Sequence, residues 1–250
     1  MTVFDRTTAM KRAPMTSLRK TALAAGALYL LTFASIPILS LYNQVLTDPN
    51  YIRGPGPDTP ILIGGVLDVI VALAGIGTAV ALYPVVKRQN QGLALGFVGA
   101  RVLEAAGILA GVASLLSVVT LHRSGAGAAA MGAGQSLVAQ YGWSFLLSGS
   151  LMPALNAVLL GSLLYRSHLV PRALPLIGLI GAPLLLACDF AVLFGLWDRV
   201  SVPSVIAALP IAVWEFSLGV YLIVKGFKPS PITASMTAAS TRAADQAALV

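Results

Sequence analysis

The stretch that decides the fold covers residues 92–121, GLALGFVGARVLEAAGILAGVASLLSVVTL, in which Arg101 and Glu104 are the only ionisable side chains. An apolar run of this length crosses the hydrocarbon core of a bilayer as a helix. Ionisable groups inside such a span are costly, and their default interpretation is a functional site. The stretch therefore predicts a membrane helix that carries a charged pair near its middle.

The composition of the whole chain indicates the same class of protein. Hydrophobic residues make up 57% of the 250 residues and charged residues only 10%, and the mean hydropathy is +0.86. A soluble domain needs roughly a quarter of charged residues to cover its surface. We therefore expect an integral membrane protein.

The composition also argues against several partners and cofactors. The formal charge of +7 is not accompanied by a basic face with aromatic or groove-reading elements, so no nucleic-acid partner is expected. The single cysteine, Cys188, permits neither a disulfide framework nor a paired-cysteine metal site. His122 and His168 fall at opposite membrane faces, and no catalytic or nucleotide-binding motif is present in the sequence. We expect no metal and no cofactor.

Six apolar segments have the length of a membrane span. They cover residues 21–42, 60–86, 92–121, 141–165, 173–197 and 203–224. Lipid forces each of them to be a helix, because backbone polar groups must pair within the segment. The predicted fold is an all-α polytopic bundle of six transmembrane helices. We divide the chain into a mobile N-terminus (1–18), a six-helix transmembrane domain (19–228) and a disordered tail (229–250).

Lysine and arginine are distributed unevenly between the two ends of the predicted helices. One end carries Arg6, Lys11, Arg12, Arg19, Lys20, Lys87, Arg88, Arg166, Arg172, Lys225, Lys228 and Arg242, and the other carries Arg53, Arg123 and Arg199. Because cytoplasmic loops are enriched in basic residues, both termini are predicted to lie in the cytoplasm, with the bundle in the plasma (inner) membrane. The first helix is interpreted as retained, because its apolar run is longer than that of a signal peptide.

The connections between the spans differ in character. Residues 43–59 contain consecutive turn signals. Residues 122–140 are rich in Gly and Ala, which predicts a flexible linker or a short surface helix. The short cytoplasmic connections 87–91 and 166–172 make the second and third helices, and likewise the fourth and fifth, antiparallel neighbours.

Polar side chains on three of the predicted helices lie at one depth. With a rise of ~1.5 Å per residue, Arg101, Asn156 and Glu215 lie about 14–15 Å from the cytoplasmic ends of their helices. Glu104 follows Arg101 by one turn, on a face of small residues that is typical of helix–helix interfaces. We expect these four side chains to meet near the midplane, where Pro153 also allows a kink in the fourth helix.

Further candidates lie outside this level. Asp68 and Asp189 lie about 28 and 26 Å from the cytoplasmic ends of their helices and are predicted to line an outer vestibule. Trp214 is predicted to form the wall of a pocket. Tyr141 and Trp143 fall at the external boundary and are interpreted as aromatic anchors.

The charges in the spans do not balance, because four carboxyl groups face one strong base. The guanidinium of Arg101 cannot lose its proton. Unpaired carboxylates are costly in apolar surroundings, so some of the four are predicted to be neutral or balanced by a bound cation or cationic ligand. Three interpretations stay open: a structural clamp in which Glu104 and Glu215 hold Arg101, a ligand site, and a path for protons or ions.

Four ordered stretches of the chain resemble one known family. They are RKTALAAGALYLLT from Arg19, IGTAVALYPVVKRQNQGLALGFVGARVLEA from Ile76, LNAVLLGSLLYRSHLVPRALPLIGLIGAPLLL from Leu155 and WEFSLGVYLIVKGFKPSP from Trp214. Between about Leu18 and Pro231 the chain is similar to the bacterial multi-pass membrane family known as domain of unknown function 4386. The resemblance implies a six-helix membrane domain, and it brings no substrate and no functional residue.

Three classes of function are compatible with these observations. The first is binding or transport of a small or amphiphilic ligand in the polar core formed by Arg101, Glu104, Asn156 and Glu215. The second is an intramembrane enzyme that uses Glu104 or Glu215 as a general acid or base on a lipid-like substrate. The third is a structural or regulatory membrane subunit. Lipids are expected partners in each case, oligomerisation stays open, and the lack of a catalytic motif favours the first class over the second.

Overall fold

The computed structural model describes residues 16–234, and this part of the chain is helical and contains no strand. The α-helices are α1 (Ser17–Thr32), α2 (Ile38–Thr47), α3 (Thr59–Val86), α4 (Gln91–Arg123), α5 (Met131–Ser144), α6 (Met152–Ser167), α7 (Ala173–Leu193) and α8 (Val202–Val224). The 3₁₀ helices are η1 (Phe33–Ser35), η2 (Tyr51–Arg53), η3 (Gly127–Ala130) and η5 (Pro231–Thr233), and η4 (Phe145–Leu151) is a π-helix. Six helical segments within residues 16–234 are long and apolar enough to span a membrane, which confirms the predicted fold class.

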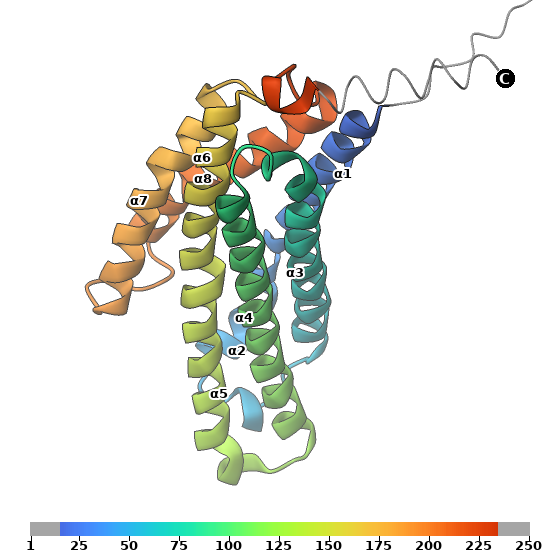
Figure 1. The fold of residues 1–250 in the computed structure, drawn as a ribbon. Coiled ribbons are helices and arrows are strands. Elements are labelled where there is room, and N and C mark those ends of the chain that lie inside the picture. Colours follow the sequence, from blue (N-terminus) through green and yellow to red (C-terminus); the bar gives the residue numbers. More distant parts are fainter. Residues whose placement is uncertain (1–15, 235–250) are drawn as a thin grey trace, which may run out of the picture.

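The six spans form a closed ring (Figure 1). Contacts run from α1 to α3, from α3 to α4, from α4 to α6, from α6 to α7, from α7 to α8 and from α8 back to α1. The α3–α4 and α6–α7 contacts confirm the two predicted pairs of antiparallel neighbours. In this order α4 and α8 stand on opposite sides of the ring.

Small residues allow the ring to close tightly. A Cβ atom added at Gly26 of α1 would lie 2.7 Å from the carbonyl oxygen of Gly219 on α8. A Cβ atom at Gly178 of α7 would lie 2.5 Å from the ring of Trp214. Neither approach leaves room for a side chain, so glycine sets the spacing of α8 against both of its neighbours.

The first span is interrupted, although residues 21–42 were predicted to form one continuous helix. The α-helix stops at Thr32, η1 follows, and α2 resumes at Ile38 and runs to Thr47. Pro37 stands directly before α2 and has no backbone N–H to continue the hydrogen-bond ladder. The span is therefore two helices with a bend between them.

The fourth span is also irregular, and it is longer than the predicted 141–165. Helical structure extends from Gly127 to Ser167 and contains the π-helix η4 immediately before α6. Pro153 lies at the start of α6 and cannot donate to the carbonyl four residues earlier, and the segment directly before α6 is π-helical. Most of the Gly and Ala-rich stretch 122–140 is helical and belongs to this long span, so it forms neither the flexible linker nor the separate short helix that were predicted.

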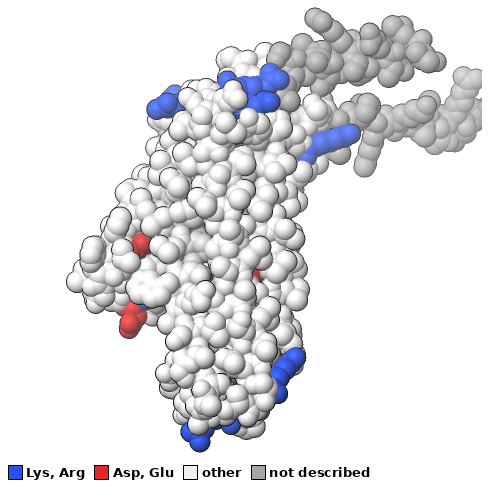
Figure 2. Space-filling model, turned by 60° about the horizontal axis from the view of Figure 1, so that its bottom comes forward, with Lys and Arg blue, Asp and Glu red and all other residues white. Residues whose placement is uncertain are grey.

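Charged side chains are concentrated at the two ends of the molecule. Figure 2 shows Lys and Arg at both ends and a middle surface that is almost free of charge. We call the end with the α4–α5 connection the outer end, which the basic residues predict to be external. The α7–α8 connection does not reach this end (Figure 1), because α7 has 21 residues and α4 has 33.

The predicted mobile N-terminus and disordered tail lie mostly outside the described residues. The first residues of the tail that the structure describes pack against the α6–α7 connection. The hydroxyl of Ser230 donates to the Ser167 carbonyl at 2.7 Å, and the N–H of Lys228 donates to the Leu169 carbonyl at 2.8 Å. These bonds hold the chain after α8 against the end of the ring opposite the outer end.

At the outer end, Asp58 fastens the α2–α3 connection to the end of α4. Its carboxylate accepts hydrogen bonds from Tyr51 Oη at 2.8 Å and Arg123 Nε at 2.7 Å, and His122 Nδ1 lies 2.8 Å away. Burial opposes ionisation of Asp58, but the bonds from Arg123, Tyr51 and His122 outweigh it and hold the pKa of the carboxyl below its ordinary value near 3.8. The other ring nitrogen of His122 lies 2.9 Å from the Gly54 carbonyl, so a protonated imidazole satisfies both acceptors.

The orientation of the bundle can be tested by cysteine labelling. In a Cys188→Ser background, single cysteines at Pro55 and Ser124 should react with a membrane-impermeant thiol reagent in intact cells, because both exposed positions lie at the outer end. A cysteine at Arg88, at the opposite end, should react only after the cells are permeabilised. Labelling of Arg88→Cys in intact cells would reverse the predicted orientation.

The Asp58 contacts should make stability depend on pH in one direction. A carboxyl whose pKa is lower in the folded than in the unfolded protein stabilises the fold above its unfolded pKa, and this contribution is lost as the pH falls through the folded pKa. The difference in thermal midpoint between wild type and Asp58→Asn should not shrink from pH 7 to about 5, where protonation of His122 strengthens its contact with Asp58, and should shrink below about 4.

The matched control for this measurement is Asp48→Asn, since the carboxylate of Asp48 accepts a backbone N–H, from Asn50 at 2.8 Å, and forms no ion pair among the described residues. Its thermal midpoint should stay near that of wild type throughout. A difference for Asp58→Asn that is as large at pH 3 as at pH 7 would show that the carboxylate charge does not stabilise the connection.

Candidate functional site

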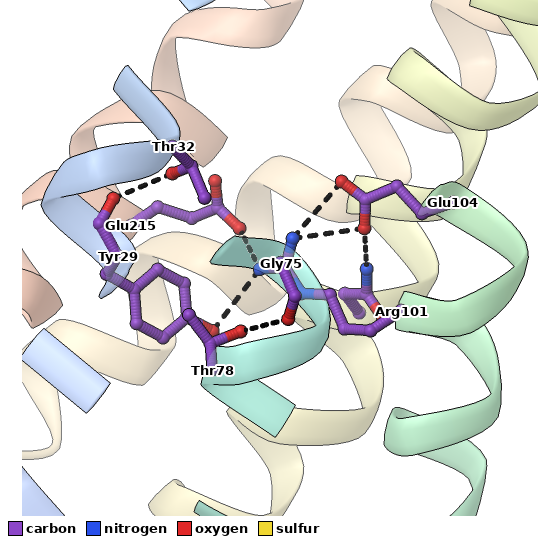
Figure 3. Close-up of polar contacts among 8 residues, drawn as sticks. Tyr29, Thr32, Gly75, Thr78, Arg101, Glu104 and Glu215 are labelled. Carbon is purple, nitrogen blue, oxygen red and sulfur yellow. Dashed lines mark hydrogen bonds and ion pairs between the residues drawn. The ribbon is translucent and has the colours of Figure 1, made fainter. Parts of the chain in front are cut away.

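Arg101 lies at the centre of the ring and bonds to carboxylates on both sides of it (Figure 3). The side chain is only 2% exposed. Its Nη1 donates to the two oxygens of Glu104 at 3.1 and 3.0 Å, and its Nη2 donates to Glu215 Oε1 at 2.6 Å. Since Glu104 lies on α4 and Glu215 on α8, the guanidinium joins opposite sides of the ring.

Two further helices contribute to this cluster. Tyr29 of α1 accepts a 3.4 Å hydrogen bond from Arg101 Nη2, and the guanidinium carbon lies 5.4 Å from the centre of the Tyr29 ring. Asn156 of α6 donates from Nδ2 to Glu104 Oε2 at 2.6 Å. The structure thus brings together the four side chains that were predicted to meet, and it adds Tyr29. We call Tyr29, Arg101, Glu104, Asn156 and Glu215 the Arg101 cluster.

A cavity of about 470 Å³ lies beside the cluster, toward the outer end. All six spans contribute to its walls, and so do both irregular segments, η1 and η4. Its charged lining consists of Asp68, Arg101, Glu104, Asp189, Arg199 and Glu215. The volume falls within the range of ~300–1,000 Å³ that is usual for small-molecule sites.

The two aspartates predicted to line a vestibule both line this cavity. Tyr42 donates its hydroxyl to Asp68 Oδ2 at 2.8 Å, and Ser150 donates to Asp189 Oδ1 at 2.5 Å. Neither carboxylate forms an ion pair in the described part of the chain. Within residues 16–234 no group of three or more His, Cys, Asp or Glu side chains is placed to hold a metal ion.

Two of the predicted core residues do not line the cavity. Asn156 is fully buried behind Glu104 and acts on the cavity only by holding that carboxylate. Trp214, predicted to form a pocket wall, is instead buried against Gly178, where α7 meets α8. Helical periodicity places a residue at a depth, but it does not say which neighbour that residue faces, so the wall was assigned to the wrong side of α8.

Two cavity residues were missed by the sequence analysis. Arg199, in the α7–α8 connection, lies over the rings of Phe145 and Tyr141, with its guanidinium carbon 4.6 and 5.6 Å from their centres. Tyr141 was interpreted as an aromatic anchor, yet it is buried and lines the cavity. No signal in the sequence separates Arg199 from an ordinary loop charge, because it follows Asp198 in a short connection.

The fold and this site define a polytopic α-helical membrane protein with a charged cavity inside its helix ring. The chain matches the family described as Domain of unknown function (DUF4386) over residues 24–226, and it belongs to that family, as the four quoted stretches predicted. No curated protein and no solved structure matches the chain. The family description carries no activity, so the function is argued from the site.

The buried ion pairs can be tested by removing the charges singly and together. Glu104→Leu leaves Arg101 a cation that cannot lose its proton, whereas Arg101→Leu leaves carboxyls that can protonate. Glu104→Leu should therefore destabilise the protein in detergent by about 3–5 kcal/mol, and the double variant Arg101→Leu/Glu104→Leu should lose less. The exposed Asp198→Asn serves as the control for a lost surface charge. Additive effects at the two positions would mean that the pair does not stabilise the ring.

Proposed function

We propose that this protein binds a small or amphiphilic molecule in the cavity beside the Arg101 cluster, within the plasma (inner) membrane. The observation that carries the proposal is one cavity, lined by all six spans, that contains four carboxylates and two guanidinium groups among mostly apolar side chains. Apolar walls with a few convergent polar groups are typical of ligand sites. A bundle with a purely structural clamp has no need of charged groups around an open volume.

The irregular backbone supports the same proposal. Inside a membrane, non-helical or π-helical backbone is tolerated where it is buried in protein or lines a cavity, and π-segments are frequent at functional sites. Both interruptions, η1 and η4, contribute residues to this cavity. Each costs regular hydrogen bonds, and each places a polar group on the cavity wall, Ser35 from η1 and Ser150 from η4.

An enzymatic role has weaker support. Ser150 donates to Asp189, so a hydroxyl is oriented by a carboxylate, but a nucleophile of this kind also needs a base to take its proton. Neither His122 nor His168, the two histidines of the chain, lines the cavity. Binding is therefore the function that the geometry favours.

A larger side chain can fill the cavity without any substitution of a charged residue. Ala212 lines the cavity on α8, and its neighbour Val213 faces outward. Native mass spectrometry of the purified wild type should detect a co-purified small molecule or lipid. Ala212→Phe should abolish this added mass, because the larger side chain occupies the site.

Val213→Phe is the matched control, since it adds the same ring on the outer surface of the same helix. It should retain the bound molecule, and both variants should unfold near the wild-type temperature. The proposal fails if the wild type carries no added mass from native membranes, or if Ala212→Phe and Val213→Phe retain the same molecule equally.

A further inference from the structure

We infer that the ligand is a zwitterionic amphiphile, with a primary ammonium group bound at Asp189 and an anionic group bound at Arg199. It reaches the cavity sideways, from the leaflet at the outer end. This inference rests on the proposed function, because it names the ligand class of the same cavity. Four observations carry it: an unpartnered oxygen, an unpartnered nitrogen, their spacing, and the position of the cavity opening.

The first observation is the state of Asp189. The residue is 4% exposed and lines the cavity. Ser150 donates to one carboxylate oxygen, whereas Oδ2 is buried and has no hydrogen-bond partner among the described residues. A buried acceptor without a donor is costly, and a buried charge without a counter-charge is more so. An ammonium N–H supplies the missing donor and the missing charge together.

The second observation is the state of Arg199. Its Nη1 is buried and has no acceptor within the described part of the chain, although the guanidinium lies over the Phe145 ring. No ion pair joins Arg199 to Asp189 or to another carboxylate of residues 16–234. A guanidinium pairs well with a phosphate or carboxylate group. Arg101 cannot bind the anionic group, because its guanidinium is already paired with Glu104 and Glu215.

The third observation is that the two side chains contact the same face of one helical segment. Asp189 contacts Ser150, and Arg199 lies over Phe145, five residues earlier in η4. Because η4 is a π-helix, with i to i+5 hydrogen bonds, these two contact residues lie about one turn apart. An ammonium group joined to an anionic group by a short linker can therefore reach both side chains at once.

The fourth observation is where the cavity opens. Ile36 of the first span and Val200 of the α7–α8 connection line it and are 75% and 58% exposed. The apolar core of the outer end draws its residues from α2, η2, α3, α4, η3 and α5 and contains none from α7 or α8. The α7–α8 hairpin is thus not packed into this outer core, and the cavity reaches the side of the bundle there.

This side opening lies at the level of the lipid chains. Exposed apolar side chains continue on α4 to Leu116, about 38 Å from the start of that helix, whereas α7 ends about 30 Å from its own start. Around the α7–α8 connection, Phe194 is 77% exposed. A ligand that passes such an apolar rim and binds through two charges is an amphiphile.

The test uses the full-length protein reconstituted in nanodiscs that contain equal amounts of phosphatidylethanolamine, phosphatidylcholine and phosphatidylglycerol. Native mass spectrometry measures which lipid each protein retains. Wild type should retain phosphatidylethanolamine over phosphatidylcholine about tenfold, because only a primary ammonium group can donate to Asp189 Oδ2. Phosphatidylglycerol, which lacks the ammonium group, should be retained no better than phosphatidylcholine.

Two single substitutions test the ammonium contact and the anion contact separately. Asp189→Asn should bring the retained phosphatidylethanolamine to phosphatidylcholine ratio close to one. Arg199→Gln should lower retention of both lipids about tenfold and leave their ratio unchanged, since both carry the phosphate. Asp198→Asn and Arg53→Gln, exposed residues that do not line the cavity, should behave as wild type. Thermal unfolding establishes that each variant is folded.

Several results would overturn the inference. One is a wild type without a preference for the primary ammonium, and another is a preference that Asp189→Asn leaves intact. Equal affinity for soluble phosphoethanolamine would show that the acyl chains, and hence the side opening, are not needed. Energetic coupling of Asp189 and Arg199 in lipid-free detergent would mean that the two residues pair with each other. In all of these cases an added mass that Ala212→Phe removes would still support the proposed function.

Discussion

The structure depends on a guanidinium that cannot lose its proton. Arg101 is buried at the centre of a ring of membrane helices, so its charge must be met by carboxylates wherever the chain places them. Glu104 meets it from the same helix and Glu215 from the opposite side of the ring, while Tyr29 and Asn156 bring in two more helices. Four of the six spans are therefore joined through Arg101 and its partner Glu104, and separating α8 from α4 breaks a buried ion pair.

The same constraint explains why the cavity lies on the outer side of the cluster. Away from the outer end the ring is filled by large apolar side chains, among them Phe97, Leu160 and Leu218, each about one turn beyond a member of the cluster. Toward the outer end the first span bends at Pro37, and the fourth span contains the π-helix η4. The α7–α8 connection lies short of the outer end. The helices diverge there, and the space between them is bordered by the carboxylates that Arg101 does not use.

The depth of each polar side chain along its helix could be predicted from the sequence, but the neighbouring helix that it faces could not. A fixed rise per residue placed Arg101, Asn156 and Glu215 at one level and Asp189 above them, and the structure joins the first three through Arg101 and Glu104. The bend at Pro37 was missed because an apolar run has the same composition whether it is one helix or two. Arg199 was counted only as a loop charge, since nothing in the sequence indicates that a short hairpin ends below the surface of its neighbours.

The arrangement has a consequence for any movement of a ligand across the membrane. The cavity reaches the side of the bundle near the outer end, whereas the Arg101 cluster and the apolar layer beyond it close the bundle toward the opposite end. A ligand could pass this layer only if α8 moved away from α4, which would break the bond between Arg101 and Glu215. A second cation at Glu215 would make that step less costly, because the carboxylate would exchange one partner for another rather than lose it. Binding from one leaflet requires no such rearrangement, and it is the activity that this geometry permits directly.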